Sequence, residues 1–311
     1  MDDLFPELKP DIPPAAPGAA GKRSGPDLAD LAGHLAGLSR HKVFIGASSW
    51  KYPGWVGQLY NRERYVYRGR FAETRFEREC LREYAATFRT VCVDAAYYTF
   101  PSAKHLDGLM GQVDAGFQFT FKVTDAITVR KFPNLPRFGQ RTGQVNDQFL
   151  NVDLFDRAFL RPLEPFRDRV GMLIFEFSRF YPSDFARGRD FLAVLEPFLA
   201  ALPPGWRYGV EIRNREFLHP DYFECLRRAN VAHVFNSWEA MPPVGEQLEL
   251  DGALTNPEFT GARLLLRPGR KYEEAVASFK PYDKVRDVYP EGRTAALRLI
   301  EGALKSAGRR G

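Results

Sequence analysis

Charged side chains stand near the ends of several alternating apolar segments in this sequence. In residues 208–213, Val210 and Ile212 share one face, whereas Glu211 and Arg213 share the other. A carboxylate beside a guanidinium can transfer a proton or hold a charged group. The alternation is typical of a β-strand, and polar residues that converge at strand ends are how a β/α barrel builds its site.

The same arrangement recurs along the chain. The polar residues that alternation places at the inward carboxyl ends of strands are Ser48, Asp94, Lys122, Glu176, Glu211, Arg213, Asn236 and Arg267. An unpaired buried charge costs several kcal/mol, so these groups must pair with each other or with a ligand. A buried ion-pair network that only sets the fold explains the same pattern, and this alternative stays open.

Two glutamates suggest acid–base chemistry. Glu176 and Glu211 are predicted on neighbouring strands, and a strand spacing of ~4.8 Å would bring their carboxyl groups near the ~5–5.5 Å separation found in retaining glycosidases. Lys122, Arg213 and Arg267 suit a phosphate or carboxylate group. We predict Glu211 and Lys122 as an acid–base pair, with Glu176 as a third catalytic residue.

Aromatic residues follow the first two predicted strands and would lie at the mouth of a barrel. Their rings could stack on a base or a sugar, although a packed lid explains them equally well. The residues predicted to bind substrate are Ser48, Trp50, Tyr52, Asp94, Tyr98, Arg213, Asn236 and Arg267.

The sequence does not predict a metal site or a cofactor. The five histidines are scattered; His41 precedes the first predicted strand, and His233 falls on an outward face. Cys92 faces inward, but no inward histidine is predicted that could activate its thiol as a nucleophile. Cys92 is therefore interpreted as a small buried residue.

Strands and helices alternate along most of the chain, which predicts a parallel sheet. A dinucleotide-binding or Walker loop does not follow the first strand, so a closed barrel is favoured over a nucleotide-binding open sheet. The predicted strands are 42–48, 90–94, 117–122, 170–177, 208–213, 231–236 and 263–267, and the last predicted helix is 294–304.

Composition shifts divide the chain of 311 residues. Residues 1–40 form a Pro-, Ala- and Gly-rich extension, predicted as disordered to about residue 25 and then as a short helix. Residues 41–311 are predicted to form a single TIM-like barrel domain. The stretch at about 129–152 contains prolines and glycines without a clear period and is interpreted as an insertion.

The net charge of +5 mildly favours anionic partners. Three distant cysteines, without a CxxC pair, indicate a reducing compartment. The sequence lacks a signal peptide and a long apolar run, so we expect a soluble, cytoplasmic protein without a membrane partner. The oligomeric state is not predicted.

Several segments together resemble a known family. They are 46–60, 90–101, 119–122 and 210–213. With them, the region from about residue 43 to 270 resembles domain-of-unknown-function family 72, the YecE-like proteins. The resemblance implies a TIM-like barrel of uncharacterised activity, similar in shape to the xylose-isomerase and endonuclease-four group. Those enzymes use carboxylate and histidine metal ligands that are not found here, so the analogy concerns fold alone.

The chain departs from the family pattern at identifiable positions. Cys92 stands where the family usually has Glu, Asp94 where it has Asn, and Glu176 where it has Gln. Relatives also end with a strand that carries an Asn-Asn pair, which is not found after residue 304. The barrel therefore closes with seven strands, or another segment fills the gap, or the chain is truncated.

Three functions are compatible with these observations. The first is a hydrolase- or lyase-like, metal-independent enzyme that acts on a small anionic or sugar-like substrate. The second is a nucleic-acid-binding or processing protein, which would use Arg130, Lys131, Arg137 and Arg141 of the insertion. The third is a non-catalytic barrel.

Overall fold

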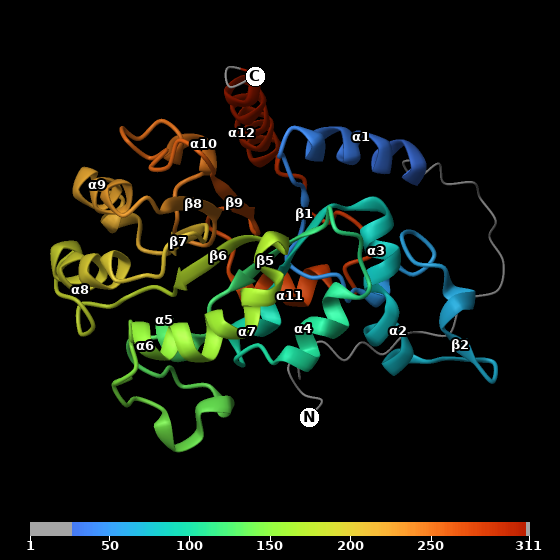
Figure 1. Ribbon diagram of the computed structural model, residues 1–311, viewed down its shortest axis with the longest axis horizontal. Coiled ribbons are helices and arrows are strands. Elements are labelled where there is room, and N and C mark those ends of the chain that lie inside the picture. The colour runs from blue at the N-terminus through green and yellow to red at the C-terminus, as the bar shows by residue number, and fades with distance from the viewer. Residues whose placement is uncertain (1–26, 309–311) are drawn as a thin grey trace.

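Seven parallel strands curl into a half-barrel that is surrounded by helices (Figure 1). The computed structural model describes residues 27–308. The strands pair in the order β1-β4-β5-β6-β7-β8-β9. Their bounds are β1 Gly46–Ala47, β4 Thr90–Val93, β5 Gln118–Lys122, β6 Val170–Phe177, β7 Tyr208–Ile212, β8 Ala232–Ser237 and β9 Gly261–Leu264. The predicted TIM-like architecture is confirmed, with an open side between β9 and β1.

Helices cover the outer face of the sheet, with α8 and α9 on one side of the molecule and α2 to α4 on the other (Figure 1). A small antiparallel hairpin, β2 (Val66–Tyr67) and β3 (Arg70–Phe71), precedes α2. The helices are α1 Leu28–Arg40, α2 Glu73–Glu79, α3 Leu81–Thr87, α4 Ala103–Met110, α5 Asp125–Thr128, α6 Val152–Leu154, α7 Arg161–Leu163, α8 Gly188–Ala200, α9 Pro220–Arg228, α10 Val244–Gln247, α11 Tyr272–Phe279 and α12 Pro290–Gly308.

Residues that alternate along each strand in the sequence lie on opposite faces of the sheet, as expected. Outward residues such as Phe119, Phe175 and Val210 are fully buried in the main core against the helices. Inward residues of the central strands form a smaller apolar layer, which includes Met172 and Val234. Charged side chains occupy the next inward positions toward the carboxyl ends, so the apolar layer forms the floor of the polar site.

Gly209 belongs to this floor because the two inward side chains beside it leave no space for a Cβ atom. A Cβ built there would lie 2.6 Å from Val234 Cγ2 and 2.8 Å from Met172 Sδ. The glycine therefore lets strand β7 approach its neighbours while the inward position two residues later is held by Glu211.

The two terminal strands differ from their predicted bounds. The first was expected over residues 42–48 but is paired only over Gly46–Ala47, and the last was expected over 263–267 but is Gly261–Leu264. Both lie at the open side, where a strand has a hydrogen-bonding neighbour on one side only. Because β9 begins and ends earlier than predicted, Arg263 lies near its carboxyl end and Arg267 lies beyond it.

The N-terminal helix and the stretch 129–152 both form regular structure beside the barrel. The predicted short N-terminal helix is α1, which packs on α3, while the expectation for residues 1–25 lies outside the described residues. The stretch 129–152 contains a 3-10 turn at Pro136–Arg141, an antiparallel bridge between Lys131 and Val145, and a small core of its own. This segment therefore folds back on itself beside the barrel.

Candidate functional site

Glu176 is the centre of a charged cluster at the carboxyl ends of the strands. Its Oε2 lies 2.7 Å from Lys122 Nζ, 2.7 Å from Arg213 Nη2 and 2.8 Å from Arg263 Nη1. Burial alone would raise the pKa of Glu176, but the charges of Arg213, Lys122 and Arg263 outweigh it and lower that pKa far below its usual range. Glu176 is therefore a permanently ionised carboxylate and is poorly suited to act as a general acid.

Arg263 joins three strands through its guanidinium group. Nη1 also donates to Glu211 Oε2 at 2.8 Å, and Nη2 donates to Asp94 Oδ1 at 3.2 Å. Strand register explains the cluster, because Glu176 lies opposite Glu211 and Asn236 lies opposite Arg263. Arg263 was not among the predicted site residues because it begins the predicted strand 263–267, whereas Arg267, of the same parity, ends it.

Lys122 behaves as a fixed cation rather than as a base. Burial acts to lower its pKa, but Glu176 and Asp94 outweigh this effect, so the pKa of Lys122 is raised. Its ammonium nitrogen also lies 4.1 Å from the centre of the Tyr97 ring, a favourable cation–π contact. This does not favour the predicted proton abstraction by Lys122 and favours a role in stabilising negative charge.

The β7 and β8 side of the cluster contains a polar atom without a partner among the described residues. On this side the guanidinium carbon of Arg213 lies 3.9 Å from the ring centre of Trp238, and its Nη2 lies 3.3 Å from Glu211 Oε1. Asn236, which is fully buried, donates from Nδ2 to the carbonyl of Ile212 at 3.0 Å, whereas its Oδ1 has no donor within the described part of the chain. A buried acceptor of this kind calls for a water or a ligand hydroxyl.

The cluster is electrically balanced. It contains three carboxylates and three cations, namely Asp94, Glu176, Glu211, Lys122, Arg213 and Arg263. We call these six residues the ionic ring. Because the charges already neutralise each other, the ring does not select strongly for a ligand with a net charge.

Other predicted site residues lie around the ring or apart from it. Tyr52 is hydrogen-bonded to Ser48 and is close to Asp94, and the exposed Tyr98 stacks under the Arg137 guanidinium at 4.6 Å. Trp50 instead lies in the helix-side core and is 5% exposed. The structure does not bring Arg267 into the cluster.

Arg267 is half-exposed, and its guanidinium lies 3.7 Å from the Asp287 carboxylate. It therefore belongs to the segment that follows β9. By contrast, Cys92 does lie next to the ring, with its thiol donating to Asp94 Oδ1 at 3.3 Å. Burial and the Asp94 charge raise the pKa of Cys92 well above its usual value, which disfavours a thiolate nucleophile.

The segment 268–289, which contains α11, crosses the mouth of the half-barrel; we call it the strap. At one end Tyr272 packs on Trp238, with 5.5 Å between ring centres. At the other end Trp55 Nε1 donates to the carbonyl of Tyr282 at 3.0 Å, and Gln58 Nε2 donates to that of Asp283 at 2.7 Å. The strap therefore links the β8 side of the site to the loop after β1, across the open side of the sheet.

Replacing Gly54 with Ala should loosen the strap. A Cβ atom at Gly54 would overlap the carbonyl oxygen of Pro281, which belongs to the backbone and cannot move alone. We expect several-fold faster trypsin cleavage after Lys284 or Arg286, measured by mass spectrometry during limited proteolysis. Gly108→Ala is the control because a Cβ there meets nothing within 4 Å, and equal cleavage rates in the two variants would contradict the prediction.

The model of the family described as "Protein of unknown function DUF72" matches residues 44–299. The chain belongs to the DUF72 family. The resemblance noted in the sequence is thereby confirmed. A search of curated proteins finds no match.

Two solved structures similar to this DUF72 chain are DUF72 family proteins themselves. One, from Enterococcus faecalis V583, has 17% sequence identity, covers 73% of this chain and 93% of its own, and gives a TM-score of 0.44. The other, from Thermotoga maritima MSB8, has 20% identity, covers 64% of this chain and 66% of its own, and gives a TM-score of 0.43.

Two further observations concern the described part of this DUF72 protein. Between residues 27 and 308, no three or more His, Cys, Asp or Glu side chains gather in a way that could hold a metal ion. None of the helices within that range is long and apolar enough to cross a membrane.

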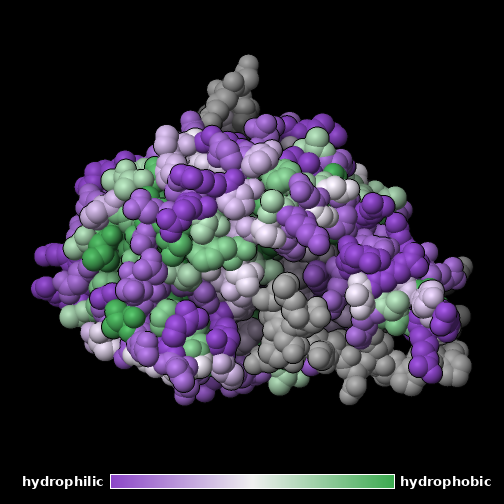
Figure 2. Space-filling model, turned by 60° about the horizontal axis from the view of Figure 1, so that its bottom comes forward, coloured by the Kyte–Doolittle hydropathy of each residue, from purple (hydrophilic) through white to green (hydrophobic). Residues whose placement is uncertain are grey.

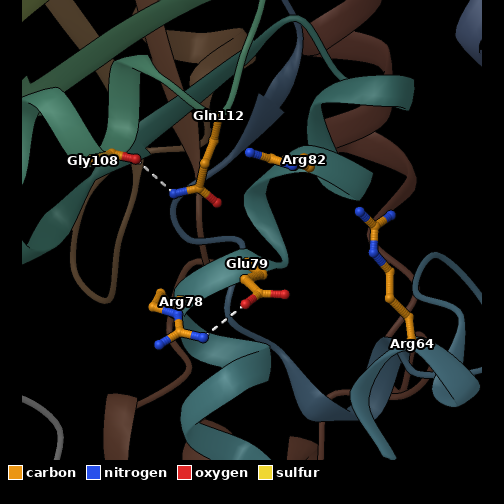
Figure 3. Close-up of a pocket in the computed structure, with 6 residues that line it drawn as sticks. All are labelled: Arg64, Arg78, Glu79, Arg82, Gly108 and Gln112. Atoms are coloured by element: carbon orange, nitrogen blue, oxygen red, sulfur yellow. Dashed lines mark hydrogen bonds and ion pairs between the residues drawn. The ribbon is translucent and has the colours of Figure 1, made fainter.

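A separate cavity of about 380 Å³ lies between the hairpin side and α4, away from the ionic ring (Figure 3). Three arginines reach it, but Arg78 lies 2.8 Å from Glu79 and Arg64 lies 3.5 Å from Glu83. Arg82 alone has no carboxylate partner among the residues described. Carboxylates near the cavity thus neutralise two of its three arginines, and the cavity is a weaker candidate site than the ring.

Proposed function

We propose that this protein binds a small, hydroxyl-rich, sugar-like ligand beneath the strap. The observation that carries the proposal is the buried Asn236 Oδ1, which has no hydrogen-bond donor between residues 27 and 308 and lies beside a charge-balanced ring. A hydroxyl group can donate to Asn236 and accept from the ring without disturbing its neutrality. A dianionic phosphate would have to displace a carboxylate, so of the two predicted substrate classes the sugar-like one is favoured.

We further propose that the protein is a hydrolase- or lyase-like enzyme in which Glu211 transfers the proton. Glu211 receives hydrogen bonds from Arg213 and Arg263, which fix the orientation of its carboxylate. Lys122 would stabilise negative charge that develops on a ligand oxygen. Glu176 is not favoured as the general acid of a glycosidase pair, because that role needs a carboxyl group with a raised pKa and the pKa of Glu176 is lowered.

Tyr52 and Trp238 give this proposal a second support. Tyr52 lies beside the ring on the β1 side and Trp238 lies over Arg213 on the β8 side. Amphipathic rings at two sides of a polar site are well placed to pack on the apolar faces of a sugar.

Ligand-observed NMR with a panel of aldoses, alditols, sugar acids and sugar phosphates tests the proposal. We expect millimolar or tighter binding of neutral members, a loss of at least tenfold in affinity for Asn236→Ala, and lost turnover of any converted member for Glu211→Gln. Glu196→Gln, which alters an exposed ion pair, is the matched control. If no member binds, or if Asn236→Ala binds as the parent does, the proposal is wrong.

A non-catalytic barrel is the second candidate, since every charge of the ionic ring is already paired within the protein. Binding without turnover of any panel member would favour it. The nucleic-acid proposal is weaker, because Arg137 in the insertion lies 2.9 Å from Asp125 Oδ2 and is not a free cation. A reducing, cytoplasmic compartment stays a proposal, supported by three free cysteines.

A further inference from the structure

A groove of about 500 Å³ lies on the outer surface, between α8 and the end of the 129–152 segment. Its walls are mostly apolar. They include Phe149, Leu150, Phe185, Val194 and Phe198, with Arg130 as the charged member. On the face shown in Figure 2, hydrophobic residues gather toward the left, the side that carries α8 in Figure 1. A half-open volume of this size is in the range of small-molecule sites.

Arg130 gives the groove a single charge. Its guanidinium carbon lies 5.7 Å from the centre of the Phe149 ring and 5.9 Å from that of Phe185. Within residues 27–308, Arg130 has no carboxylate within ion-pair distance, in contrast to its neighbour Arg137. An unpaired guanidinium that is held against two phenyl rings at the edge of an apolar groove complements a carboxylate with an apolar tail.

The backbone of the groove supplies an independent indication. Leu150 has a positive φ of 56°, a conformation that is strained for a branched side chain. The conformation is held by a hydrogen bond from its N–H to the carbonyl of Ile127 at 2.9 Å, and it places Leu150 in the groove wall. Strained residues of this kind gather at ligand sites, where the surrounding structure maintains them.

We propose that this groove binds an apolar monocarboxylate, such as a straight-chain fatty acid of about ten carbons. The carboxylate pairs with Arg130, and the tail lies along Phe149, Leu150 and Val194 toward Phe198. The site is separate from the ionic ring and does not depend on the function proposed for it.

Isothermal titration of the full chain with decanoate, decanol and decyltrimethylammonium tests this site. We expect decanoate to bind at least tenfold more tightly than decanol, and the cationic amphiphile to bind most weakly. Arg130→Gln should remove the preference for decanoate and leave decanol binding unchanged. Arg189→Gln, at an exposed arginine of α8, should keep the parental preference and serves as the control.

A second variant separates the groove from other apolar surfaces. Val194 is 42% exposed, so Val194→Trp can fill the groove without altering the core, and it should weaken both decanoate and decanol at least tenfold. Equal binding of decanoate and decanol to the parent would overturn the proposal. So would unchanged binding by Val194→Trp with folding confirmed by circular dichroism.

Discussion

Replacing Glu176 with Gln should lower the free energy of unfolding by about 3–5 kcal/mol, because it leaves buried cations without their shared carboxylate. Lys122, Arg213 and Arg263 all approach the same Glu176 oxygen within 2.8 Å, and its side chain is 3% exposed. Urea denaturation at pH 7, with the slope compared between variants, measures the change.

Glu196→Gln is the matched control for this substitution. Its partner, Arg228, lies at a similar distance of 2.7 Å, but both side chains are more than half exposed. Exposed pairs contribute about 0–1 kcal/mol, so the control should differ little from the parent. If the two variants lose the same stability, Glu176 is not the centre of the buried network.

The pH dependence of the Glu176 variant has a definite sign. The pKa of Glu176 is lowered in the folded state, so its contribution is fully present above the unfolded pKa of 4.5 and is lost as pH falls below that value. The difference in the free energy of unfolding between parent and Glu176→Gln should therefore shrink below about pH 4.5.

Adding Cys92→Glu to the Glu176→Gln variant, which places a carboxylate near Lys122 and Arg263, should recover part of the lost stability at pH 7.

Replacing Arg263 with Gln should also lower the free energy of unfolding by about 3–5 kcal/mol, because it leaves carboxylates of the ring without a cation. Among the residues described, only Arg263 contacts all three carboxylates of the ionic ring, and it is 9% exposed. Its removal leaves the buried Glu176 and Glu211 and the partly buried Asp94 with two cations. Urea denaturation at pH 7 and at pH 4 measures the effect, and Arg228→Gln is the exposed control.

The loss of stability in the Arg263 variant should depend on pH with the same sign as in the Glu176 variant. Arg263 is one of the three cations that lower the pKa of Glu176 in the folded state, so this pKa should rise toward its usual value in the variant. The loss relative to the parent should therefore shrink as pH falls below about 4.5, the pKa of Glu176 in the unfolded chain. A loss that stays constant below that pH would show that the guanidinium acts by packing alone.

Local alternation was enough to predict much of the fold and the ring. Because side chains alternate strictly along a strand, the inward placement of Asp94, Lys122, Glu176 and Glu211 followed once each strand was located. Helix-side residues such as Phe119 followed in the same way. These features depend on neighbours in the sequence, and the sequence contains them directly.

Features that depend on where a strand stops were predicted less well. The last strand ends earlier than predicted, so Arg263 rather than Arg267 lies near its carboxyl end and Arg267 lies beside Asp287. Pairing with β8 rather than local alternation sets the bounds of β9. Trp50 was expected at the mouth from its place after β1, yet it turns into the helix-side core. The strap was also not predicted, since Trp55 and Gln58, which hold one end of it, lie more than 200 residues before that end in the chain.

The open side of the sheet implies an uneven resistance to local opening. β1 is paired along one edge and over two residues, and β9 exposes Ala262 and Leu264, whereas β6 is paired on both sides and is almost wholly buried. Amide protons of β5 to β7 should therefore exchange with solvent only through global unfolding, whereas those of β1 and β9 exchange through fluctuations at the margin. Because Arg263 sits on the marginal strand β9 and holds Glu176 and Glu211 on the central strands, the ionic ring ties the most labile part of the sheet to the most persistent part.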